Sequence, residues 1–268
     1  MRIRVNFEPE DFFSIDVNYN VVLQGFIYRH ISEELAKFLH DEGYIHEKRS
    51  FKLFTFSRLS SPHGAMRYNR RTKRIETASA FGFVISSPVE RVIKEFASSM
   101  ASDVDITLGS NRVRVSEIDV LKPPEFGEKI KIRMLSPVTV YSTLKKQDGR
   151  KKTYYYHPTE PGFEELIKKN LLKKLRSLHP DTAEYADELS HSEFKIDMLS
   201  DNYNPKVQIV RYKGFIIKGY MGKYIISANP LLIELAYHAG IGAKNSQGFE
   251  IIGNKYKGDN YDRGIMNI

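Results

Sequence analysis

The sequence contains no cysteine among its 268 residues. This absence excludes disulfides, cysteine-ligated zinc, iron–sulfur clusters and a thiol nucleophile. No uninterrupted apolar run approaches the ~18 residues that indicate a membrane span, so we expect no membrane partner. The first residues, MRIRVNFEPEDFF, also lack the apolar stretch of a secretory signal. We therefore expect a cytoplasmic protein.

Positive charge is concentrated in two parts of the chain. Lys and Arg total 41 against 33 Asp and Glu, which gives a formal net charge of +8. Residues 49–74 hold eight basic residues and no acid, whereas residues 145–178 hold ten basic residues against four acids. These segments carry +8 and +6, which leaves the rest of the chain at −6. Both contain tyrosines, and cations with aromatic rings suit nucleic acid, although two solvated faces would give the same pattern.

Apolar periodicity predicts strands and helices in a similar order in the two halves of the chain. In residues 2–7, Arg, Arg and Asn alternate with Ile, Val and Phe, the pattern of a half-buried strand. Residues 20–42 have helical spacing with an internal N-cap at Ser32, which predicts one kinked helix or two short ones. Further elements are expected as helices at 88–100, 160–178 and 230–239, strands at 51–59, 104–108, 112–121, 129–141 and 249–252, two strands within 206–227, a hairpin at 64–85 and a basic arm at 145–156.

The order of these elements predicts an α+β fold of two tandem domains. Each half shows strands, helix, strands, helix and strand, without the regular alternation that a parallel sheet requires, so we expect ferredoxin-like (RRM-like) domains with antiparallel sheets. The segment KPPEFGE at 122–128 interrupts the pattern with two prolines and a glycine. We place the N-terminal domain at 1–123, the C-terminal domain at 124–255 and a polar tail at 256–268.

A glycine-rich segment follows the last predicted helix. Residues 240–250, GIGAKNSQGFE, contain three glycines with Lys, Asn and Ser between them. Glycines let a backbone approach phosphates closely, and the polar side chains add hydrogen-bond donors. The segment is neither a P-loop, because the GK[ST] ending is missing, nor a dinucleotide fingerprint, because it follows a helix. A helix cap that leads into a turn explains the same residues, so both interpretations stay open.

The glycine-rich segment resembles the signature of the RAMP superfamily of CRISPR-associated proteins. Residues 240–242 and 248–249 match it, whereas Glu250 stands where the signature ends in glycine. Other stretches resemble the CRISPR repeat-processing endoribonuclease that matures guide RNAs, and they follow the same order along almost the whole chain. These stretches are LQGFIYRHI (23–31), FLH (38–40), KLFTFS (52–57) and LSPV (135–138).

The resemblance implies a metal-independent ribonuclease site with no cofactor, made of a Tyr, a His and a Lys. By position in the motifs these are Tyr28, His40 and Lys52. The implied reaction is attack of the RNA 2′-hydroxyl on its own phosphate, which leaves a 2′,3′-cyclic phosphate and a 5′-hydroxyl. Histidine transfers protons near neutral pH, lysine stabilises the charged phosphorane, and the tyrosine is either the base or the group that orients the 2′-hydroxyl. His46 is the alternative catalytic histidine.

The resemblance also implies that CRISPR repeat RNA, single-stranded or folded as a hairpin, lies across both halves. The alternative functions are a non-catalytic RAMP protein that binds guide RNA in an effector complex, and a general RNA-binding protein. Effector-complex subunits and a second copy of the chain are further expected partners. The candidate RNA contacts are Arg67, Arg70, Arg71, Lys73, Arg74, Lys151, Lys152, Gly240, Gly242, Lys244, Asn245, Ser246 and Gly248.

Overall fold

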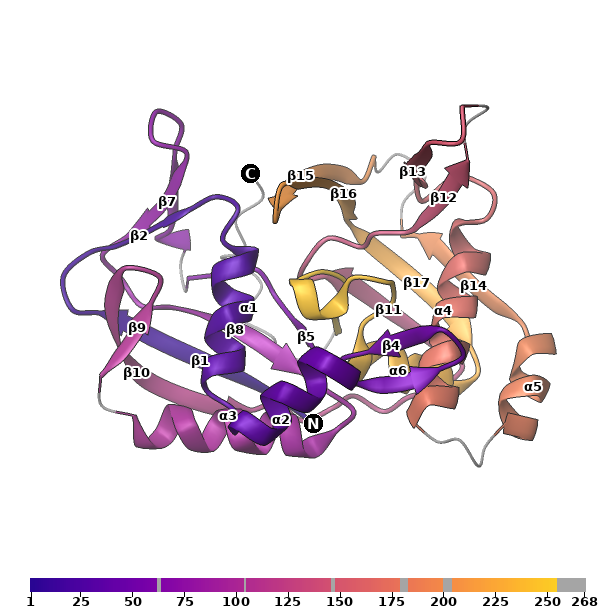
Figure 1. Cartoon of the computed structure of the whole chain (residues 1–268), viewed down its shortest axis with the longest axis horizontal. Coiled ribbons are helices and arrows are strands. Elements are labelled where there is room, and N and C mark those ends of the chain that lie inside the picture. Colours follow the sequence, from indigo (N-terminus) through magenta and orange to yellow (C-terminus); the bar gives the residue numbers. More distant parts are fainter. Residues whose placement is uncertain (62–63, 104, 146–147, 179–182, 200–203, 255–268) are drawn as a thin grey trace.

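The structure, a computed structural model, places two antiparallel sheets side by side, each with its own helices (Figure 1). It describes residues 1–61, 64–103, 105–145, 148–178, 183–199 and 204–254. The predicted α+β class with antiparallel sheets is therefore confirmed. The expected polar tail at 256–268 lies outside the described residues.

The sheet of the first half has the ferredoxin-like strand order. Its elements are β1 (Arg2–Pro9), α1 (Asn20–Arg29), β5 (Thr55–Phe56), β8 (Phe81–Ser86), α3 (Glu90–Ser102), β9 (Ile106–Leu108) and β10 (Asn111–Val120). The strands lie in the order β5-β8-β1-β10-β9, and every pair is antiparallel. Because α1 lies between β1 and β5 in the chain and α3 between β8 and β10, the connectivity is βαββαβ.

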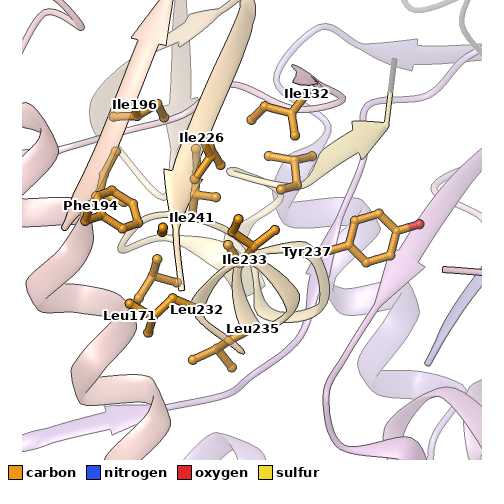
Figure 2. Packing of buried hydrophobic residues seen from close by; sticks show 14 of the residues in the cluster. Ile132, Leu171, Phe194, Ile196, Ile226, Leu232, Ile233, Leu235, Tyr237 and Ile241 are labelled. Atoms are coloured by element: carbon orange, nitrogen blue, oxygen red, sulfur yellow. The ribbon is translucent and has the colours of Figure 1, made fainter. Parts of the chain in front are cut away.

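The second half repeats this arrangement. Its elements are β11 (Lys129–Met134), α4 (Phe163–Leu178), α5 (Ala183–His191), β14 (Phe194–Met198), β17 (Lys223–Ala228), α6 (Pro230–Ala239) and β18 (Ile252–Asn254). The sheet order is β14-β17-β11-β18, again antiparallel. Figure 2 shows Ile233 of α6 and Leu171 of α4 in one apolar cluster with side chains of the sheet, among them Ile132, Phe194 and Ile226. The burial of these apolar faces stabilises the half as one layer of helices on one sheet.

In the described part of the chain, one three-stranded sheet and three antiparallel pairs accompany the two main sheets. They are β2 (Phe13–Asp16) with β7 (Arg74–Thr77) and β6 (Arg67–Asn69), β3 (Tyr44–His46) with β4 (Arg49–Phe51), β12 (Tyr141–Lys145) with β13 (Lys151–Tyr155), and β15 (Lys206–Tyr212) with β16 (Phe215–Met221). The hairpin predicted at 64–85 is confirmed over β6 and β7, whereas the end of that range belongs to β8 in the main sheet. The basic arm is the β12–β13 hairpin. In Figure 1 the β6–β7 and β12–β13 hairpins project from the same edge of the molecule, one from each half.

The segment 20–42 forms two short α-helices and a wider turn. Ser32 caps α2 (Glu33–Lys37) because its hydroxyl accepts a hydrogen bond from the Leu35 amide at 3.3 Å. A π-helical turn, η1 (Phe38–Glu42), follows, and Gly43 ends it with φ of +69°. Among the helices of the described residues, none combines the length and the apolar character that crossing a bilayer requires.

The polar side of β1 is buried, which the alternating pattern of residues 2–7 did not predict. Arg2 and Arg4 are each only 2% exposed. Arg2 donates hydrogen bonds to the carbonyl oxygens of Ile252, at 2.7 Å, and Tyr237 in the second half. Hence the expectation of a half-buried strand is wrong, because the second half covers the face that would otherwise meet water.

Other differences from the predicted elements lie where the chain passes between the halves. The strand expected at 51–59 is reduced to the ends of β4 and β5, because Leu53 takes φ of +53° and enters the core of the second half. The strand expected at 129–141 ends at Met134, shortly before Pro137. The region 206–227 holds parts of three strands rather than two, because Gly222 separates β16 from β17. Helix α5 and strand β14 were not predicted.

Candidate functional site

His40 and Lys52 lie in direct contact at the junction of the two halves. The turn η1 presents His40 at the surface, with its side chain 78% exposed. The Lys52 ammonium group donates a hydrogen bond of 3.0 Å to the His40 backbone carbonyl oxygen and one of 3.2 Å to Ser50 Oγ. Partial burial lowers the pKa of Lys52, and the nearby Asp41 carboxylate opposes this effect. The structure therefore binds a cation to the backbone of the residue that carries an accessible imidazole.

Asp41 pairs with the imidazole of His40. Its Oδ1 atom lies 2.7 Å from His40 Nδ1. The hydrogen bond from His40 is the main cause that holds the pKa of Asp41 below its ordinary value. A carboxylate at Nδ1 leaves Nε2 as the ring nitrogen free to act toward solvent. Sequence reasoning missed Asp41, since an acid next to a histidine is unremarkable until the side chains are placed.

Tyr28 stands on α1 against the segment that follows Lys52. Its ring packs edge-on against Phe54, with ring centroids 5.7 Å apart and an angle of 70° between the planes. Burial, and secondarily the neighbouring Tyr212, raises the pKa of Tyr28 to about 12. The phenol therefore keeps its proton throughout the neutral range. Tyr28 therefore contacts the segment between Lys52 and β5 through Phe54. Lys52, by contrast, forms a hydrogen bond with the His40 backbone.

His46 lies in a different setting from His40. It stands on β3, which packs against α4 of the second half. Its side chain is 22% exposed, and its Nε2 atom lies 4.0 Å from a Glu47 oxygen. The His40 ring is therefore more accessible to solvent than that of His46.

Most of the candidate contacts in the glycine-rich segment are buried. Gly240 and Gly248 have φ of +79° and +82°, and Gly240 ends α6 as predicted. Gly240, Gly242, Asn245 and Gly248 are buried, while Lys244 and Ser246 are partly exposed. The Lys244 ammonium lies 4.8 Å from the centre of the Tyr141 ring. Of the six candidate RNA contacts in this segment, Lys244 and Ser246 are the ones that solvent reaches.

The candidate contacts on the two hairpins are mostly exposed. Arg67, Arg70, Arg71 and Lys73 project into solvent on the β6–β7 hairpin. Arg74 differs, because its guanidinium donates hydrogen bonds to the hydroxyl and backbone carbonyl of Ser14 at 2.7 and 2.6 Å. On the β12–β13 hairpin the remaining two contacts, Lys151 and Lys152, are exposed. In Figure 1 the β6–β7 hairpin lies at the edge opposite α2.

A pocket of about 190 Å³ lies between the glycine-rich segment, α4 and the β3–β4 hairpin. Arg49, Lys169 and Lys173 supply positive charge to its wall. Among the described residues no partner is found for the buried oxygens Thr139 Oγ1 and Asn170 Oδ1, which belong to lining residues. Lys169 and Lys173 are paired with Glu165 and Glu47. Arg49 and the Thr139 hydroxyl can therefore bind an anion, whereas the Asn170 carbonyl oxygen can only accept a hydrogen bond. The three cations fall within the two basic stretches of the sequence, but sequence reasoning did not single them out, since nothing local shows that three segments converge.

Metal-ligating side chains do not gather elsewhere in the part of the chain that the structure describes. No group of three or more His, Asp or Glu residues there is arranged to hold an ion.

Comparison with known families matches nearly the whole chain. Residues 14–119 match the family model described as "CRISPR-associated protein Cas6, N-terminal". Residues 121–252 match "CRISPR associated protein Cas6, C-terminal". The CRISPR-associated endoribonuclease Cas6 1 of Methanocaldococcus jannaschii is 26% identical, over 95% of this chain and 92% of its own. The CRISPR-associated endoribonuclease Cas6 of Pyrococcus furiosus is also 26% identical, over 95% and 91%.

Solved structures agree with the fold. A structure titled "CRISPR associated protein Cas6" superposes with a TM-score of 0.74 at 25% identity, and covers 95% of this chain and 98% of that one. The product of a Cas6-related gene from Pyrococcus furiosus superposes with a TM-score of 0.76 at 22% identity, and covers 96% and 99%. Both likenesses extend over the two halves, so the tandem arrangement of ferredoxin-like folds is shared.

Proposed function

This chain belongs to the Cas6 family of CRISPR-associated proteins, and from that premise we propose that it cuts CRISPR repeat RNA at the junction of its two halves. It is an RNA-cleaving enzyme that processes repeat RNA, as its relatives' names indicate for them. The hydrogen bond from Lys52 to the His40 backbone carries the proposal for the site, because it ties a charge-stabilising group to the residue whose exposed imidazole can transfer a proton.

The residues at the junction fit an in-line transesterification without a metal. The 2′ oxygen of the RNA attacks the adjacent phosphorus, and its proton passes to solvent while Tyr28 holds the hydroxyl. The P–O5′ bond breaks, and the protonated His40 imidazole gives its proton to the leaving 5′ oxygen. Lys52 stabilises the negative charge on the phosphorane oxygens. The products are a 2′,3′-cyclic phosphate and a 5′-hydroxyl.

The raised pKa of Tyr28 favours orientation over proton abstraction. A phenol with a pKa of about 12 supports only a minute fraction of phenolate at neutral pH. Its hydroxyl still donates and accepts hydrogen bonds, so it can hold the 2′-hydroxyl in line. Asp41 would act on the reaction through His40, by fixing the ring through Nδ1.

We place the repeat RNA across both halves. The exposed cations of the β6–β7 and β12–β13 hairpins would contact phosphates along one edge. The pocket, with Arg49 and the Thr139 hydroxyl in its wall, would hold a phosphate closer to the junction. Delivery of the cut RNA to effector subunits and pairing with a second copy stay predictions from the resemblance.

Incubation of the protein with candidate repeat RNAs in EDTA tests the function and the metal-independent route together. We expect one cut within the cognate repeat, with a 2′,3′-cyclic phosphate on one product and a 5′-hydroxyl on the other. Cleavage that needs added Mg²⁺, or termini of another kind, would contradict the mechanism. Tight binding without any cut would favour the non-catalytic RAMP protein.

A further inference from the structure

Glu250 occupies a backbone position that favours glycine. Its φ is +77°, in the left-handed region where a side chain costs strain. The residue is also fully buried. A charged-type side chain in a strained, buried position needs compensation from the contacts that it makes.

The Glu250 carboxyl group fills the space beneath Gly242. Its Oε1 atom accepts a hydrogen bond from the Lys244 amide at 3.0 Å, and the Ala243 amide also bonds the carboxyl group. A Cβ atom built on Gly242 would lie 2.5 Å from Glu250 Cδ, closer than real Cβ contacts come. Glycine at 242 is therefore required by the carboxyl group, and not by φ, which is not in the left-handed region.

Lys174 binds backbone carbonyl oxygens of the same segment. Its buried ammonium donates hydrogen bonds to the carbonyl oxygens of Gly240, at 2.7 Å, and Gly242, at 2.8 Å. Glu250 thus holds amides of the segment while Lys174 holds its carbonyl groups. Two buried ionisable side chains fix the segment from inside.

The glycine-rich segment in turn forms hydrogen bonds with α1 and β5, the two elements that flank the proposed cleavage site. Asn20 at the start of α1 donates to the Gly248 carbonyl oxygen at 3.1 Å. Gln24, one turn later, donates to the Ser246 carbonyl oxygen at 2.7 Å. On the other side, the Thr55 hydroxyl of β5 donates to the Phe249 carbonyl oxygen at 2.8 Å. Helix α1 carries Tyr28, and Lys52 lies three residues before β5.

We infer that Glu250 is a positioning residue of the nuclease: its carboxyl group, seated under Gly242, fixes the glycine-rich segment that sets α1 and β5 at their working separation. The inference rests on the proposed function, because positioning is judged by RNA cleavage. It also means that the amides of Ala243 and Lys244 serve Glu250 and do not bind an RNA phosphate. The segment meets RNA through side chains such as Lys244.

Cleavage kinetics of Glu250→Gly and Glu250→Gln test the positioning role. Glu250→Gly relieves the strain but removes the carboxyl group, so we expect kcat to fall by on the order of 10-fold while the Kd for repeat RNA stays within about threefold. Glu250→Gln keeps an acceptor oxygen and should stay within about threefold of wild type in kcat. Glu188→Gln, exposed on α5, is the matched control. A kcat for Glu250→Gly equal to wild type, or a loss of affinity with unchanged kcat, overturns the inference.

A double-mutant cycle between Gly242 and Glu250 tests the contact itself without RNA. Gly242→Ala should lower the melting temperature by roughly 5 °C in the wild-type background, because its methyl group meets the carboxyl group. In the Glu250→Gly background Gly242→Ala should lower the melting temperature far less, since the carboxyl group is then absent. An equal fall in melting temperature in the two backgrounds would refute the contact between the Glu250 carboxyl group and Gly242. If the wild-type protein cuts no RNA, the proposed function fails, whereas this cycle still decides whether Glu250 fixes the segment.

Discussion

The ammonium group of Lys52 donates hydrogen bonds to the backbone carbonyl oxygen of His40 and to Ser50 Oγ. An ammonium group has three N–H donors, so these bonds leave one for another acceptor. That third donor is the one we assign to the phosphorane in the proposed reaction. The two internal bonds hold the charge in place before RNA arrives, which reduces the reorganisation needed in the transition state.

Replacement of His40 by Ala should separate the chemical step from binding. We expect the single-turnover cleavage rate in EDTA to fall by on the order of 10² or more, because the leaving 5′ oxygen loses its proton donor. The Kd for repeat RNA, measured by filter binding, should change little. His46→Ala is the control, and its rate should stay near wild type. The opposite result, a normal rate for His40→Ala and a large loss for His46→Ala, would move the catalytic role to His46.

Replacement of Tyr28 by Phe should lower the cleavage rate without changing its dependence on pH. Because burial raises the pKa of Tyr28 to about 12, the hydroxyl does not titrate between pH 6 and about 10. We expect a loss of roughly 10-fold at every pH in this range, from poorer alignment of the 2′-hydroxyl. Rate–pH profiles of both proteins, measured with saturating RNA, provide the check. A slope toward high pH that is present in wild type and absent in Tyr28→Phe would instead make the tyrosine the base.

Local sequence signals predicted those elements whose causes are local. Ser32 caps α2, and Gly240 ends α6 with a positive φ, because an N-cap hydroxyl and a glycine at the C-cap act within a few residues. The resemblance to the repeat-processing endoribonuclease added the candidate triad. The contact between Lys52 and His40 agrees with it, although the roles of the three residues stay predictions.

Features that depend on the packing of one half against the other were not predictable in this way. Arg2 has the sequence context of a surface residue, and its partners Tyr237 and Ile252 lie in the last third of the chain. Leu53 leaves its own sheet because the second half offers it a core position. The pairing of Asp41 with His40 depends on the π-helical turn, which has no reliable sequence signal.

Charge reversal on the β6–β7 hairpin should weaken RNA binding and reduce its salt dependence. Arg70 and Arg71 are exposed, and each phosphate contact contributes a slope of roughly 0.7 in log Kd against log salt for a single strand. We expect the double variant Arg70→Glu/Arg71→Glu to lose about that much slope for each contact removed. The matched control reverses two exposed lysines elsewhere, Lys94 and Lys195. An unchanged slope in titrations at several salt concentrations would show that this hairpin does not touch phosphate.

The buried pair of Glu250 and Lys174 should give the folded protein a dependence on pH that single substitutions remove. Burial raises the pKa of Glu250 from 4.5 to about 7, with Lys174 and Lys244 as the charges that oppose the rise. As the pH rises from 4.5 to 7, the unfolded chain releases this proton while the folded chain keeps it, so the free energy of unfolding falls. Burial lowers the pKa of Lys174 from 10.5 to about 7. Above pH 7 the unfolded chain therefore holds the extra proton, and the free energy of unfolding rises again.

Urea unfolding of the wild-type protein and of Glu250→Gln from pH 5 to pH 10 measures this dependence. Gln does not titrate, so between pH 5 and pH 8 the free energy of unfolding of the variant should increase relative to that of wild type by on the order of 2 kcal/mol. Above pH 8 the free energy of unfolding of both proteins should rise, because Lys174 is present in both. In Lys174→Met the free energy of unfolding should still fall as the pH rises toward 7, but it should no longer rise above pH 7. Parallel curves for all three proteins would mean that neither group titrates inside the fold, and the shifted pKa values would then be wrong.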